Sequence, residues 1–140
     1  MKSLKETILE KLNLNTNGVI FEKLKLSDLK QYNYHPKTKE ELKELLRQLI
    51  KERGNDGDFN DIDTSEITDM SNLFDGMTNF NGDISKWDVS NVTNMEQMFD
   101  ECKLFNKPLN DWDVSKVRNM RQMFSGCESF NQPLDKWDVS

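Results

Sequence analysis

The stretch WDVSNVTNMEQMFDECKLFNKPLND, residues 87–111, decides the fold, because residues 112–136 repeat it as WDVSKVRNMRQMFSGCESFNQPLDK. Fifteen of the 25 aligned positions are identical, and the second copy follows the first without an insertion. A more divergent copy, IDTSEITDMSNLFDGMTNFNGDISK, occupies residues 62–86, and a partial copy, WDVS, occupies residues 137–140. Self-similarity with a period of about 20–50 residues is typical of proteins built from stacked coils. The repeat therefore predicts a solenoid of 25-residue coils.

Within each copy, the apolar spacing predicts a short helix followed by a short extended strand. Ser90 suits a helix N-cap, and apolar residues from Val92 to Cys102 recur at helical spacing. The segment 105–114 contains a proline and alternates as a short strand does. Neither arm could bury its apolar side alone. We therefore expect an α/β fold in which the coils stack and the extended arms form a narrow parallel sheet.

Aligned apolar positions indicate the core. The slots of Trp87, Val92, Met98 and Leu109 hold large apolar residues in every full copy. Such exchanges keep bulk and change shape, so these columns are predicted to be packed interior and not a ligand cage. Two phenylalanine columns never vary, and they are Phe74, Phe99 and Phe124, and Phe80, Phe105 and Phe130.

Three polar or sulfur columns also recur. Asn81, Asn106 and Asn131 follow the second phenylalanine, and we expect them to bond to turn backbone in their own and the next coil as a ladder. Asp63, Asp88, Asp113 and Asp138 form an acidic column that could bind a divalent cation; the favoured alternative is that each accepts from backbone amides or is solvated. Cys102 and Cys127 share a column with Met77, which favours buried free thiols over a disulfide.

The residues before the repeats predict a helical region, 1–54, that ends in a cap for the repeat region, 55–140. Ser3–Glu6 and Thr38–Glu41 are capping boxes. An apolar stripe follows the second box from Leu42 to Ile50, and Gly54 suits a left-handed C-cap. A terminal coil needs a cover for its apolar side, and this helix could supply it.

The loop 55–63, NDGDFNDID, has two interpretations. Asp56, Asn60 and Asp63 fall at three ligand positions of a calcium loop counted from Glu52. However, Gly54 would occupy a ligand position without a side-chain oxygen, and Asp63 is shorter than the usual bidentate glutamate. We favour a turn that leads into the first coil, and we expect no bound metal.

Composition bounds the class of protein. The chain has a net charge of −6 and a pI near 4.9, which argues against nucleic-acid binding. It has no run of about 20 apolar residues that could span a membrane. It also shows no secretory signal, so we expect either a cytoplasmic protein or one whose leader is missing from this sequence.

Catalysis is not expected. The single histidine, His35, lies outside the repeats beside a proline. The sequence has no zinc-ligand spacing, no glycine-rich phosphate loop and no serine-hydrolase motif. We predict a protein that is not an enzyme and needs no cofactor.

A binding or scaffold function with a protein partner is the favoured hypothesis, because positions outside the core change chemistry from copy to copy. These columns are the candidate binding residues Glu66, Asn91 and Lys116; Thr68, Thr93 and Arg118; Ser71, Glu96 and Arg121; Gly82, Lys107 and Gln132; and Lys86, Asp111 and Lys136. The alternative is an assembly role. The chain stops at Ser140, four residues into a coil, and an uncovered last coil could pair with another copy.

The repeat WDVSxVxNMxxMFxxCxxFNxPL resembles the 25–26-residue repeat of BspA-like bacterial surface proteins and mycoplasma lipoproteins. The entry stretches 36–43 and 60–70 also look like that family's, so the resemblance covers about residues 36–140. It implies a leucine-rich-repeat-like solenoid and a role in cell-surface adhesion or host interaction. It carries over no catalytic residue.

Overall fold

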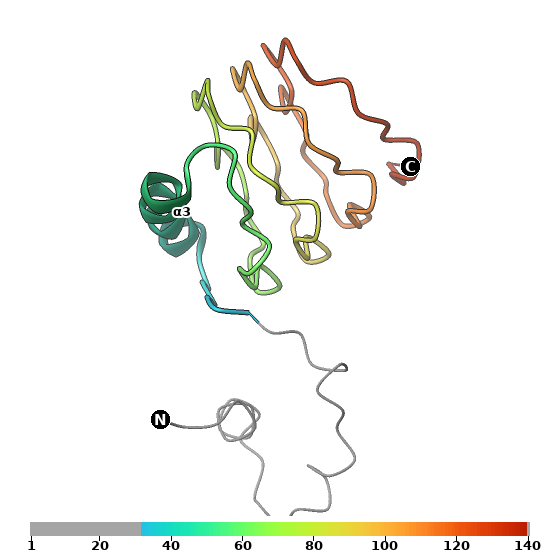
Figure 1. The fold of residues 1–140 in the computed structure, drawn as a ribbon. Helices are drawn as coiled ribbons and strands as arrows, with labels where there is room; N and C mark the ends of the chain where they lie inside the picture. Colours follow the sequence, from blue (N-terminus) through green and yellow to red (C-terminus); the bar gives the residue numbers. More distant parts are fainter. Residues whose placement is uncertain (1–31, 140) are drawn as a thin grey trace, which may run out of the picture. The chain divides into compact units, whose positions relative to one another are not determined.

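The computed structural model describes residues 32–139, which belong to one compact unit. The capping box at residues 3–6 and the helix expected after it lie outside the described residues. Within them the chain enters one helix, α3, and then runs through successive coils that lie side by side (Figure 1).

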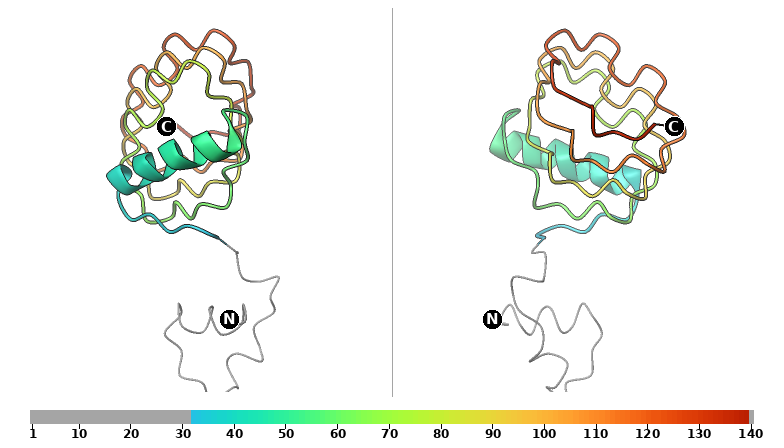
Figure 2. Two further views of the ribbon diagram at one scale, coloured as in Figure 1. Left: turned by 60° about the vertical axis from the view of Figure 1, so that its left-hand side comes forward. Right: turned by 90° about the vertical axis from the view of Figure 1, so that its right-hand side faces the viewer.

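The helix α3 spans Lys39–Arg53, and its ends are those that the sequence predicted. Thr38 Oγ1 accepts from the Glu41 amide at 3.2 Å, and the Gly54 amide, at a φ of 82°, donates to the Ile50 carbonyl. Its buried leucines join the same core cluster as the repeats, and they are Leu42, Leu46 and Leu49. α3 lies across the first coil (Figure 2), and the coils described by the structure all lie on one side of it.

The 25-residue copies stack in register. The rings of Phe74, Phe99 and Phe124 are parallel neighbours with centroids 5.4 and 5.6 Å apart. The second column, Phe80, Phe105 and Phe130, has a spacing of 5.9 Å. Within one coil the two phenylalanine rings stack on each other, with their centroids 4.3–4.5 Å apart. The predicted phenylalanine columns are confirmed, and together they form the spine of the core.

The predicted secondary structure of the coils is wrong. The described residues contain α3 as their one helix, four isolated parallel bridges and no strand or sheet. Ser90 begins no helix, residues 96–101 form turns, and the segment 105–114 contains no strand. The expectation of an α/β leucine-rich-repeat-like solenoid with a narrow parallel sheet is therefore overturned.

Backbone hydrogen bonding explains why no helix forms in a coil. The amides of Asn72, Phe74 and Gly76 donate to carbonyls of the next coil at 2.8–2.9 Å. The amides between them close tight turns, as Leu73 does to the Met70 carbonyl. An α-helix needs each amide for the carbonyl four residues back and a φ near −63° throughout. Instead, the chain is left-handed at Asn72 and again at Gly76, with φ of 60° and 78°.

Proline explains why no sheet forms on the opposite side. Pro108 and its equivalent Pro133 have no amide hydrogen, so a regular ladder cannot run through this column. The first copy has Asp83 there, and Asp83 does pair with Asp58 in a parallel bridge. Gly57-Asp58-Phe59 thus matches Gly82-Asp83-Ile84, and the repeats begin half a coil earlier than the sequence suggested.

Side chains tie each coil to the preceding one. The indole Nε1 of Trp87 donates to the Phe59 carbonyl at 2.9 Å, and Trp112 and Trp137 repeat this bond 25 residues apart. Cys102 and Cys127 are free thiols, as predicted, and Sγ of Cys102 donates to the Phe74 carbonyl. Burial raises the pKa of Cys102 to about 12, so this thiol stays protonated.

Candidate functional site

Two of the predicted surface columns lie next to each other and are exposed in all three coils. In each coil, two exposed residues flank one aliphatic residue in the sequence. The aliphatic residue points inward: Ile67 and Val92 are buried, and Val117 is half-buried. We call this surface the variable face. It consists of Glu66, Thr68, Asn91, Thr93, Lys116 and Arg118.

Main-chain hydrogen bonds hold the variable face rigid. The Thr93 amide donates to the Thr68 carbonyl, and the Arg118 amide donates to the Thr93 carbonyl, both at 2.8 Å. Asn91 Nδ2 reaches the Ser65 carbonyl at 2.7 Å, and its Oδ1 accepts from Lys116 Nζ at 3.3 Å. A bridge between Asn94 and Asn119 lies directly beside these bonds. A surface held in this way is preorganised, so binding loses little conformational freedom.

Charge changes sign along the variable face. The first coil presents Glu66, the second is neutral, and the third presents Lys116 and Arg118. The neighbouring column extends the trend, because Arg121 is exposed and forms only a 3.8 Å ion pair with Glu96. The face is therefore acidic near the first coil and basic at the third.

The structure separates the other predicted binding residues from this face. Ser71 is buried, with its hydroxyl 3.0 Å from Lys39 Nζ of α3. Gly82 is buried against the Phe59 ring, which a Cβ would meet at 2.5 Å. The remaining residues are half-buried at Lys107 and Gln132 and exposed at Lys86, Asp111 and Lys136. Ser71 and Gly82 have no surface to offer a partner.

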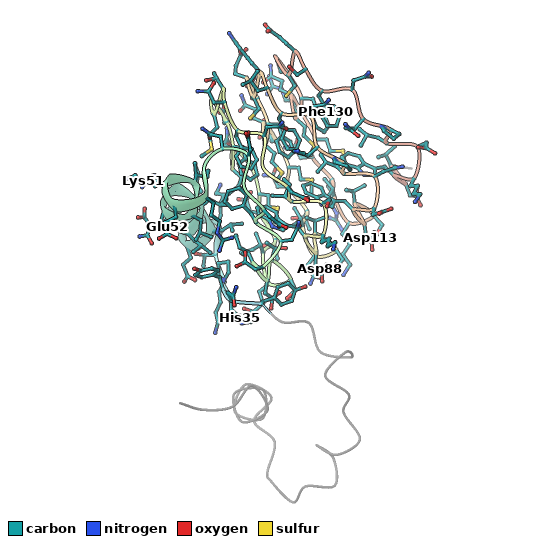
Figure 3. All side chains as sticks on the ribbon, viewed as in Figure 1. His35, Lys51, Glu52, Asp88, Asp113 and Phe130 are labelled. Atoms are coloured by element: carbon teal, nitrogen blue, oxygen red, sulfur yellow. The ribbon has the colours of Figure 1, made fainter. Side chains whose placement is uncertain are left out.

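The acidic column has a structural role in turns. Asp63, Asp88 and Asp113 each accept through Oδ1 from the amide of the serine two residues later, at 3.0–3.1 Å. Hydrogen bonds from the Ser115 hydroxyl and amide lower the pKa of Asp113. Asp88 and Asp113 occupy the second and third coils (Figure 3). In the first coil, His35 Nδ1 lies 3.3 Å from Asp63 Oδ2. The interpretation as backbone acceptors is confirmed for these three aspartates.

Two of the three residues considered for a calcium loop, Asn60 and Asp63, accept hydrogen bonds from main-chain amides. Asn60 Oδ1 accepts from the Lys86 amide at 2.8 Å, and the Asn60 amide donates to Asp58. Asp63 is used as described above, and Asp56 is exposed. Among residues 32–139, no group of three or more histidine, cysteine or acidic side chains is arranged to hold a metal ion.

One concave feature was not predicted. A groove of about 390 Å³ separates the C-terminal half of α3 from the turn 76–79. Its walls carry Arg47 and Lys51, and its floor carries Ile50 and Met77. No sequence signal joins these residues, because their approach depends on how α3 packs on the first coil.

Comparison with known proteins identifies the family. Residues 41–140 match the family described as mycoplasma protein of unknown function, DUF285. The chain belongs to the DUF285 family. No curated protein and no solved structure matches it. The DUF285 match begins within α3 and continues through all the coils, so it includes both the variable face and the groove. Within the described part of this DUF285 chain, every helix is too short or too polar to cross a bilayer.

Proposed function

We propose that this DUF285 chain is a non-enzymatic protein-binding module that recognises its partner through the variable face. The observation that carries the proposal is a contrast within three consecutive residues of each coil. The middle residue is Ile67, Val92 or Val117 and points inward, whereas both of its neighbours are exposed and change chemistry from coil to coil.

The chemistry of the face supports a protein as partner. Threonine hydroxyls, an asparagine amide and charges of both signs lie on a hydrogen-bonded surface, with a hollow lined by Thr93, Lys116 and Arg118. A charge gradient orients a partner whose charges are complementary, and it excludes a partner that would place like charges against the face. The likeness of the repeat to that of BspA-like surface proteins supports a partner at a cell surface.

Affinity capture with the full chain as bait tests this proposal. One variant carries Glu66→Ala, Lys116→Ala and Arg118→Ala on the variable face. Its matched control carries Lys86→Ala, Asp111→Ala and Lys136→Ala, which are equally exposed. Thermal melts of both variants should match the unmodified chain, because exposed substitutions change stability by only about 0.5 kcal/mol.

We expect a protein captured by the unmodified chain and by the control to be lost with the face variant. The captured protein is then purified and titrated against all three chains by calorimetry. A partner that binds the face variant as tightly as the unmodified chain, or that is lost only with the control, overturns the proposal.

A further inference from the structure

The groove between α3 and the turn 76–79 has an apolar floor and an open mouth. Ile50 and Met77 are half-buried, packing on the core from outside and leaving part of each side chain in the groove. On the turn, a Cβ at Gly76 would meet no atom within 4 Å, and both Thr78 and Asn79 are exposed.

The first coil differs from the second at this turn. The slot of Met77 holds Cys102 in the second coil, where the thiol is fully buried. Gly76 is replaced by Glu101, which adopts a left-handed φ of 61°. Leu104 takes the slot of Asn79 and is 52% exposed, although leucine is usually buried. Its amide donates to the Thr78 carbonyl at 3.2 Å, which places Leu104 directly beside the groove.

The α3 wall of the groove is cationic. Arg47 and Lys51 lie one helical turn apart, so their side chains are neighbours. Among the described residues, Lys51 has no acidic partner, and it is exposed (Figure 3). Arg47 pairs with Glu44 at 2.7 Å, but both groups are more than half exposed. Such a pair contributes only about 0–1 kcal/mol, so Arg47 can turn to another anion.

We propose that this groove binds a short acidic peptide segment of a partner protein. An apolar side chain of the peptide rests on Ile50 and Met77, and neighbouring carboxylates pair with Arg47 and Lys51. Leu104 supplies a second apolar contact across the turn. The volume of about 390 Å³ lies within the range of about 300–1,000 Å³ that is usual for small ligand sites. The groove shares no residue with the variable face, so this proposal does not depend on the proposed function.

An array of hexapeptides built from Asp, Glu, Leu, Phe and Ser is the probe, with a second array in which Lys and Arg replace Asp and Glu. The blocking variant is Asn79→Trp. Its matched control is Ser129→Trp, the same repeat position two coils on, where the residue is also exposed. Lys51→Glu reverses charge at the wall, and Lys86→Glu is its control on an exposed residue outside the groove.

We expect the full chain to retain acidic peptides that contain Leu or Phe and to ignore the basic array. Asn79→Trp and Lys51→Glu should each weaken the best peptide at least about tenfold, and both controls should bind it unchanged. Three outcomes overturn the proposal: no acidic peptide is retained, Asn79→Trp binds as well as Ser129→Trp, or an oligonucleotide of equal charge competes fully, which would mean that charge alone is recognised.

Discussion

In the second and third coils, which contain Pro108 and Pro133, the two sides join the preceding and following coils by different chemistry. On the side that contains the left-handed residues, main-chain amides such as that of Phe74 donate to main-chain carbonyls of the next coil. On the proline side, the Asn106 amide donates instead to the side-chain oxygen of Asn81, and the Asn131 amide to that of Asn106. The predicted asparagine ladder is therefore confirmed between successive coils, where Asn81 and Asn106 are the acceptors.

This difference shows what a repeat position must supply. The left-handed side needs particular backbone angles, so it accepts glycine, asparagine, glutamine and even glutamate. The proline side needs one particular side-chain acceptor, and the three full copies all have asparagine there. A position that joins coils through its main chain tolerates many side chains, whereas a position that joins them through its side chain requires one residue type.

Removing the contact that joins both sides should have the largest effect. Phe99 lies on the left-handed side and stacks on Phe105 of the proline side at 4.5 Å, and it is fully buried. Phe99→Ala should lower the free energy of unfolding by about 3–5 kcal/mol, measured by chemical denaturation. Phe124→Ala should cost less, because Phe124 is half-buried. Equal, small losses would mean that the ring columns do not hold the coils.

The asparagine ladder is the next target. Asn81→Ala leaves the Asn106 amide without its acceptor and should cost about 1–3 kcal/mol. Asn131→Ala is the matched control at an exposed site and should cost about 0.5 kcal/mol or less. If the two variants unfold at the same denaturant concentration, the proline side does not depend on its side-chain bonds.

Backbone angle is tested by an exchange between coils on the left-handed side. Gly76→Ala should destabilise by about 1 kcal/mol, because alanine is strained at a φ of 78°. Glu101→Gly at the same repeat position should be neutral or stabilising, since it relieves a strained residue at 61°. Differential scanning calorimetry would show a lower melting temperature for Gly76→Ala and an unchanged or higher one for Glu101→Gly. Shifts of equal sign and size would refute the role of the left-handed angle.

The attachment of the first coil to α3 should be sensitive to acid, with the smallest effect. Arg53 donates two hydrogen bonds to Asp61, at 2.8 and 3.0 Å, and they lower the pKa of that carboxyl. Because the folded pKa is below the unfolded one, the stabilisation is complete above the ordinary value of 3.8 and is lost as pH falls through the folded pKa. Asp61→Asn should melt lower than the unmodified chain at pH 7, and the difference should shrink as pH falls below 3.8.

The sequence by itself determined the period, the core columns and the helix before the repeats. Phe99 and Trp112 each belong to a column of large apolar residues that recurs every 25 residues. Such side chains are buried because they are apolar, wherever the backbone places them. The ends of α3 were legible because Thr38 and Gly54 act on their immediate neighbours. The variable columns could be enumerated, but the sequence did not distinguish exposed Lys116 from buried Ser71.

Only the tertiary structure decided what the backbone between these columns does. The spacing from Val92 to Cys102 suits a helix, but every second amide from Met95 to Glu101 donates to a carbonyl 24 residues away in the next coil. A periodicity in one chain segment reports which side chains are buried and not where its amides donate. The groove on α3 has the same origin, because its two walls meet only when distant segments pack together.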